Sequence, residues 1–198
     1  TKWQLHTIGD LVREKIIAEP MDGNHGEMHP KGNDFKKIGI PFIMASDIKN
    51  SLIDFGRCKY ISKYQADELR KGFSQAGDVL LSHKATIGET AIVPKLDFPY
   101  LMLTPQVTYY RVLDSNKLNN KFLKYYFDSP LFQKILKLRA GAGSTRAYLG
   151  IIAQKDLPIS IPDIRKQKQI VDVLSVIDEK IEINNQINSE LEAMVKLI

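Results

Sequence analysis

The sequence changes character at Pro162, and this change limits the possible fold more than any other feature. Before Pro162, short apolar runs rich in β-branched and aromatic residues are interrupted by Gly and Pro, as in a mixed α/β domain. After it, residues 163–198 contain neither Pro nor Gly, and Asp163 is a suitable N-cap. We therefore predict an α/β domain over residues 1–161, followed over residues 162–198 by one coiled-coil-forming helix of roughly 50 Å.

The apolar residues of this helix recur with the alternating four- and three-residue spacing of a coiled coil. We expect the following residues to form a dimer or subunit interface: Ile170, Leu174, Ile177, Ile181, Asn184, Asn188, Leu191 and Val195. The two asparagines would fix register or partner number, or they lie near a loop in a bent helix. A helix packed on its own domain would show a similar stripe, but a helix of this length outruns a small domain.

Within residues 1–161 the elements are expected to be short. The predicted strands are residues 41–45, 78–81, 91–93, 107–112 and 157–161. The predicted helices are residues 63–71 and 117–139, the second interrupted near Ser129 and Pro130. Residues 20–39, with four Gly and two Pro, are expected to form a long loop, a kind of segment that is commonly functional.

The composition limits the possible partners and cellular location of the chain but does not indicate one function. The formal net charge of +5, from 28 Lys and Arg against 23 Asp and Glu, modestly favours a polyanionic partner. The single cysteine, Cys58, excludes an intrachain disulfide. No window approaches the roughly 20 apolar residues of a membrane span, and no apolar signal core is present at the start. We expect a cytoplasmic protein with no membrane partner.

The sequence offers few catalytic motifs. Asp97-Phe98-Pro99-Tyr100 resembles the Asp-Pro-Pro-Tyr loop of amino-methyltransferases but lacks the second proline, and no Gly-rich cofactor loop follows a strand. His25 and His29, near Asp22 and Glu27, imitate a metal cluster but sit in a polar segment without further ligands. We predict no catalytic site, no metal and no cofactor.

Polar and basic residues gather instead at predicted loop tips. Hydroxyl groups and backbone amides there suit phosphate oxygens, and Arg can grip guanine with two hydrogen bonds. The candidate DNA-binding residues are Lys84, Thr86, Gly88, Gly143, Ser144, Thr145 and Arg146, with Lys31, Lys36 and Lys37 from the long loop. By composition alone, loops that are merely solvated are equally consistent with these residues.

Several short motifs are weak indicators of a protein family when taken singly, but their order and spacing along the chain make a stronger one. They are Ile8-Gly9-Asp10, Gly77-Asp78-Val79-Leu80-Leu81, Thr86-Ile87-Gly88, Gly143-Ser144-Thr145-Arg146 and Leu157-Pro158-Ile159-Ser160-Ile161-Pro162. In this order the chain resembles the specificity subunit of type I restriction-modification systems over nearly its whole length. One departure concerns the helix start, where the family commonly shows Pro-x-x-x-Glu-Gln and this chain has Pro162, Lys166 and Gln167.

The resemblance implies a non-catalytic target-recognition domain that reads one half of a bipartite double-stranded DNA site, joined to a spacer helix. Family members usually hold two such domains and two helices packed antiparallel, whereas this chain has one of each. We therefore expect a half-subunit, natural or truncated, that forms a homodimer through its helix. The implied protein partners are the modification (methyltransferase) subunit and, as a further candidate, the restriction subunit. Two alternatives stay open: an oligomerising scaffold that does not bind DNA, and a fragment of a single-chain DNA methyltransferase or nuclease.

Overall fold

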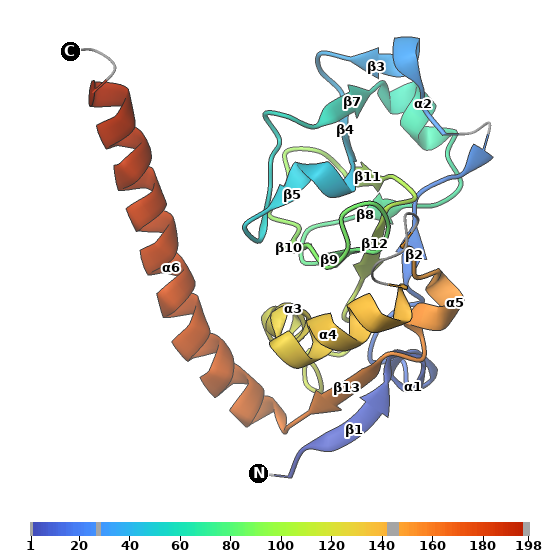
Figure 1. Ribbon diagram of the computed structural model, residues 1–198. Helices are drawn as coiled ribbons and strands as arrows, with labels where there is room; N and C mark the ends of the chain where they lie inside the picture. Colours follow the sequence, from blue (N-terminus) through green and yellow to red (C-terminus); the bar gives the residue numbers. More distant parts are fainter. Residues whose placement is uncertain (1, 27–28, 142–146, 196–198) are drawn as a thin grey trace.

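The computed structural model describes residues 2–26, 29–141 and 147–195. Figure 1 shows a domain of small sheets and short helices, from which one long helix projects. This is the mixed α/β architecture with a C-terminal helix that the sequence predicts. No described helix is both long and apolar enough to cross a membrane.

Two sheets pack against each other in the body of the domain. The five-stranded sheet has the order β3 (Phe35–Lys36), β7 (Lys59–Ile61), β4 (Ile40–Ile43), β11 (Leu101–Leu103) and β8 (Phe73–Ser74). The four-stranded sheet has the order β10 (Thr90–Ile92), β9 (Val79–Ser82), β12 (Val107–Tyr110) and β2 (Met21–Asp22). Two separate antiparallel pairs are β5 (Ile48–Lys49) with β6 (Leu52–Ile53), and β1 (Gln4–Thr7) with β13 (Pro158–Ile161).

Short helices cover the four-stranded sheet on one side and the five-stranded sheet near β7. They are α1 (Ile8–Arg13), α2 (Lys63–Asp67), α3 (Asn120–Asp128), α4 (Pro130–Arg139) and α5 (Ile151–Gln154), with 3₁₀ turns at Gly32–Asp34 and Ala45–Asp47. The break predicted near Ser129 is confirmed. The Ser129 hydroxyl accepts from Phe132 N–H at 3.3 Å, and Pro130 occupies the first turn of α4, so Ser129 ends α3 and caps α4.

The apolar residues divide into three clusters, each between particular layers. The largest lies between the four-stranded sheet and the helices, and includes Leu11, Tyr110 and Phe127. A second, with Ile43 and Leu80, fills the space between the two sheets. A third lies under α2.

Two predictions about elements were wrong. The predicted helix 63–71 ends at Asp67, and Arg70 N–H donates to the Asn24 Oδ1 at 3.0 Å in place of a helical carbonyl. Residues 20–39 are not one loop, since they contain β2, β3 and a 3₁₀ turn. The predicted strands are all present, with ends shifted by one or two residues.

The long helix α6 (Ile164–Val195) has 32 residues and is about 48 Å long. Its start is fixed by Gln167, which is fully buried. The Gln167 Oε1 accepts from Asn119 N–H at 2.9 Å, and its Nε2 donates to the carbonyls of Lys117 and Pro162, each at 2.9 Å. One side chain thus joins the start of α6, the end of β13 and the start of α3.

The second half of α6 leaves the domain. Among the described residues, the last polar contacts between α6 and the domain are those of Asp178, whose carboxylate accepts from Tyr125 Oη at 2.7 Å and lies 3.8 Å from Lys124 Nζ. Every described residue from Val176 to Val195 is exposed. Figure 1 accordingly shows the helix diverging from the domain toward its C-terminal end.

We expect Gln167→Leu to lower the free energy of unfolding by about 2–4 kcal/mol, since each buried polar group left without a partner costs about 1–3 kcal/mol. Denaturation by urea measures this loss. Gln169→Leu, at an exposed position of the same helix, is the control, with an expected change within about 0.5 kcal/mol. Equal losses in both variants would contradict the structural role assigned to Gln167.

Candidate nucleic-acid interface

One face of the four-stranded sheet changes from apolar to polar along its strands. Tyr110 pairs with Val79 and Thr108 with Leu81, and in the next pair His83 N–H donates to the Gln106 carbonyl at 2.9 Å. Paired residues of an antiparallel sheet share a face. Tyr110 on this face belongs to the core that the helices cover, and farther along the same face lie the polar residues Thr108, His83 and Gln106. Polar groups therefore collect where β9 ends and β12 begins.

Asp22 of β2 belongs to the same face and organises the polar end. It pairs with Thr108, is 2% exposed, and forms an ion pair with Lys71. Its other carboxylate oxygen lies 3.0 Å from His25 Nε2. This placement requires the pairing of β2 with β12, which was not predicted because the Gly and Pro residues of 20–39 favour a loop.

His83 lies beneath this surface, fully buried. Neither ring nitrogen has a hydrogen-bond partner among the described residues, and the ring lies against Tyr148 with centroids 5.5 Å apart. Burial lowers the pKa of His83 to about 4, so the imidazole is neutral at physiological pH.

The turn that follows His83 presents two of the predicted DNA-binding residues. Lys84 and Thr86 are exposed, and the Lys84 Nζ lies 5.7 Å from the centre of the Tyr148 ring. The Ser82 hydroxyl accepts from Glu89 N–H at 2.8 Å and closes the base of the turn. Lys84 is therefore held at the surface by a short, internally bonded turn.

Gly88, also predicted to bind DNA, has a packing role in this turn. Its φ is +100°, and a Cβ would lie 2.2 Å from the Gln133 Oε1. The Gln133 Nε2 donates to the carbonyls of Gly88 and Phe127, each at 2.8 Å. These contacts join the turn to α4.

Other residues in or next to the motifs that the chain shares with specificity subunits also stabilise the domain. Thr7 and Asp10 form a capping box at the start of α1, with Thr7 N–H donating to Asp10 at 2.7 Å and Asp10 N–H to Thr7 at 3.1 Å. Asp78 accepts two hydrogen bonds of 2.8 Å from the Arg111 guanidinium. The motifs therefore contribute to stability as well as to any contact with DNA.

The other predicted DNA-binding segment contains Gly143, Ser144, Thr145 and Arg146. These four residues lie outside the part of the chain that the structure describes. The residues that flank them are placed beside the first turn: Tyr148 N–H donates to the Ala140 carbonyl at 3.0 Å, and Leu149 N–H donates to the His83 carbonyl at 3.1 Å.

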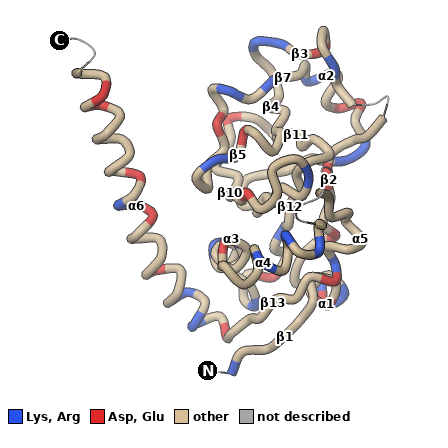
Figure 2. The backbone as a smooth tube through the Cα atoms, viewed as in Figure 1, with Lys and Arg blue, Asp and Glu red and all other residues tan. Residues whose placement is uncertain are grey.

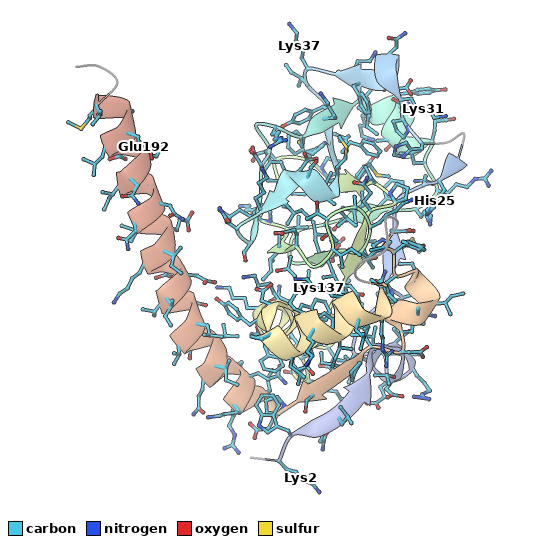
Figure 3. All side chains as sticks on the ribbon, viewed as in Figure 1. Lys2, His25, Lys31, Lys37, Lys137 and Glu192 are labelled. Carbon is cyan, nitrogen blue, oxygen red and sulfur yellow. The ribbon has the colours of Figure 1, made fainter. Side chains whose placement is uncertain are left out.

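The three lysines from the predicted long loop lie around β3 and are exposed. Figure 3 places Lys37 at the end of the domain opposite Lys2, beyond the position of Lys31 and His25. Burial lowers the pKa of His29, and the positive charge of Lys31 lowers it further. Lys31 therefore influences the charge of His29.

A cavity of about 280 Å³ opens at this polar region. Its walls include His25, His29, Met44, Lys84, Thr104 and Gln106. The polar sequence around the two histidines indicated a solvated loop, whereas the structure brings them to the same cavity as Lys84. Among the described residues no group of three His, Cys, Asp or Glu could hold a metal ion. A signal that could have found Gln106 is the polar break at residues 104–106 between two apolar runs.

The predicted interface residues of α6 fall into two groups. Ile170 packs against the largest core cluster of the domain and Leu174 is half-buried, so this part of the stripe faces the chain's own domain. Beyond it, Ile177, Ile181, Leu191 and Val195 are exposed by 50–71%, and Asn184 and Asn188 are exposed as well. The exposed part of the seam is thus available to another helix.

The model of the type I restriction modification DNA specificity domain matches residues 1–193. The chain belongs to this family. It is 28% identical over 203 residues to a protein named as the MjaX type I restriction enzyme specificity subunit of Methanocaldococcus jannaschii, with 98% of this chain and 43% of that protein covered.

Solved structures share the fold. A structure of a type I restriction-modification system matches with a TM-score of 0.66 at 18% identity, covering 98% of this chain and 43% of that one. The HsdS subunit from Thermoanaerobacter tengcongensis gives 0.63 at 17% identity, with 91% of this chain and 38% of that one. The type I S subunit from M. genitalium gives 0.61 at 18% identity, with 91% and 40%. The chain spans less than half the length of these relatives.

We expect the stability of the domain to fall between pH 6.5 and pH 4 because of His83. Above pH 6.5 the residue is neutral in both states; below it, the unfolded chain takes up a proton that the folded domain accepts only near pH 4. The free energy of unfolding, measured in urea at several pH values, should fall more steeply for the wild type than for His83→Leu, by up to about 1.4 kcal/mol per pH unit. Identical slopes would show that His83 is not buried in its neutral form.

Proposed function

We propose that the chain reads one half of a bipartite site in double-stranded DNA and confers this specificity on a type I restriction-modification complex. Residues 1–161 form the target-recognition domain in this proposal, and residues 162–198 form the spacer helix. The match of the specificity-domain family to residues 1–193 carries the proposal. The chain itself is proposed to be non-catalytic, with methylation and cleavage assigned to separate modification and restriction subunits.

The charge of the domain supports DNA as its partner. Residues 1–163 contain 23 Lys and Arg against 17 Asp and Glu, and the basic residues occur around β3, β7 and α4 in Figure 2. Such a surface attracts the phosphate backbone. Lys84 and Thr86, exposed beside the polar end of the sheet, are proposed to contact the DNA first. A scaffold that does not bind DNA is not favoured by the family match.

The exposed half of α6 supports a homodimer with antiparallel helices. Residues 176–195 carry five acidic side chains and only one Lys, whereas the start of the helix carries Arg165, Lys166 and Lys168. An antiparallel partner would place the acidic half of one helix beside the basic start of the other, and would cover the apolar seam that includes Ile181. A parallel partner would align the two acidic halves.

Selection of bound duplexes from a random pool tests the function, using the full chain in complex with a modification subunit. We expect the wild type to enrich an inverted repeat of a short motif with a fixed spacer, because two copies read two half-sites. Ile181→Asp should break the helix pair, shown by a halved mass in light scattering of the free chain, and should enrich the single motif without the repeat.

Ile183→Asp is the matched control for this experiment, since Ile183 is exposed on the same helix but lies off the predicted seam. It should keep both the dimer mass and the repeat. Enrichment of no motif by the folded wild-type complex would overturn the proposed function. Enrichment of single motifs by the wild type would overturn only the homodimer.

A further inference from the structure

The cavity beside Lys84 is built from segments that are distant in sequence. His25 and His29 follow β2, whereas Thr104 and Gln106 lie between β11 and β12. Its volume of about 280 Å³ lies just below the range of roughly 300–1,000 Å³ typical of small-molecule sites. It therefore suits one small group that projects from a larger partner better than a whole cofactor.

The charge of the lining indicates the class of ligand. Among the described residues, the lining contains the ammonium group of Lys84 and no carboxylate. The nearby carboxylate of Asp22 is 2% exposed and is already bonded to Lys71 and His25. A ligand in the cavity therefore meets a positive charge that no described acidic side chain of the lining neutralises, and this favours an anion.

Two uncharged side chains of the cavity can donate to such an anion. Ala45 N–H donates to the Gln106 Oε1 at 3.2 Å, and the Gln106 Nε2 donates to no described residue. Thr104 is 2% exposed, and its hydroxyl has no partner among the described residues. A hydroxyl donates or accepts according to its partner, so Thr104 can adapt to an anion without selecting it. The selection comes from the charge of Lys84.

The backbone holds Lys84 and Gln106 at the same end of the four-stranded sheet. His83, directly before Lys84, donates its N–H to the Gln106 carbonyl at 2.9 Å and accepts from Leu149 N–H at 3.1 Å. The bond between Ser82 and Glu89 closes the turn that carries Lys84. The two donors are therefore presented from a backbone that is bonded on both sides.

We infer that this cavity holds one phosphate group of the DNA backbone, with Lys84 and Gln106 donating to its oxygens. A phosphate lies on the outside of the duplex and carries a negative charge, whereas base edges are recessed in the grooves. Lys, Thr and Gln side chains are all common partners of phosphate oxygens, and such contacts fix the register of a protein on the duplex. This inference rests on the proposed function and adds to it an anchoring contact with the residues that make it.

Neutral methylphosphonate groups, placed one at a time in the selected duplex, test the inference with the full chain in complex with a modification subunit. We expect one position at which the replacement weakens wild-type binding by about 10- to 100-fold, the factor for a hydrogen bond to a charged group. At that position Lys84→Met, a change of an exposed side chain, should lose much less than the wild type does.

Gln106→Glu provides a test in which the effect changes sign. The Glu carboxylate still accepts from Ala45 N–H but repels a phosphate in the cavity. This variant should bind the duplex more tightly when the phosphate at that one position is neutral than when it is charged. Gln75→Glu is the matched control, because Gln75 is exposed and precedes β9, whereas Lys84 follows it. It makes the same charge change and should lose as much as the wild type.

All three variants should select the wild-type motif, because a phosphate contact carries no direct sequence information. A changed motif would show that the cavity reads a base, and would overturn the phosphate site while half-site reading stands. The same loss in the wild type and in both cavity variants at every position, as for a site that takes only free phosphate, would overturn it as well. If the wild-type complex selects no motif, the proposed function fails, and the phosphate site with it.

Discussion

The direction of the long helix depends on one buried amide. Gln167 bonds to the backbones of Asn119, Lys117 and Pro162, so α6 leaves the domain at an angle set by the start of α3 and the end of β13. The pairing of β13 with β1 anchors the same junction from the other side. A helix used to fix the distance between two DNA-reading domains needs such a rigid base. The replacement of the family's usual Glu by Lys166 leaves this junction intact, because the bonds are made by Gln167.

The candidate interface depends in turn on strand register. The face shared by β9, β12 and β2 is apolar where helices cover it and polar from Thr108 onward, where Asp22 pairs with Thr108 and His83 N–H donates to the Gln106 carbonyl. Gln106 lines the same cavity as Lys84. A shift by one residue would turn these side chains to the opposite face. The buried polar groups are thus a consequence of the same pairing that builds the core.

Local sequence signals predicted the elements whose ends are determined by residues close in sequence. The long helix follows from the absence of Pro and Gly after Pro162, and the break at Ser129 follows from a cap and a proline. The pairing of Gln4–Thr7 with Pro158–Ile161 and the contact of His25 with the Lys84 cavity were not predictable in this way, because they join segments far apart in the chain. For the same reason the sequence showed an apolar stripe on α6 but not that Ile170 faces the chain's own domain.

The length of the recognised site tests most directly whether α6 sets the distance between the half-sites. Duplicating residues 179–185 in the exposed part of α6 adds one heptad, keeps the seam in register and lengthens the helix by about 10 Å. If two antiparallel helices separate two reading domains, selection from random duplexes should return the same half-sites with a spacer longer by about three base pairs, at roughly 3.4 Å each. An unchanged spacer would contradict the claim that α6 sets the distance between half-sites.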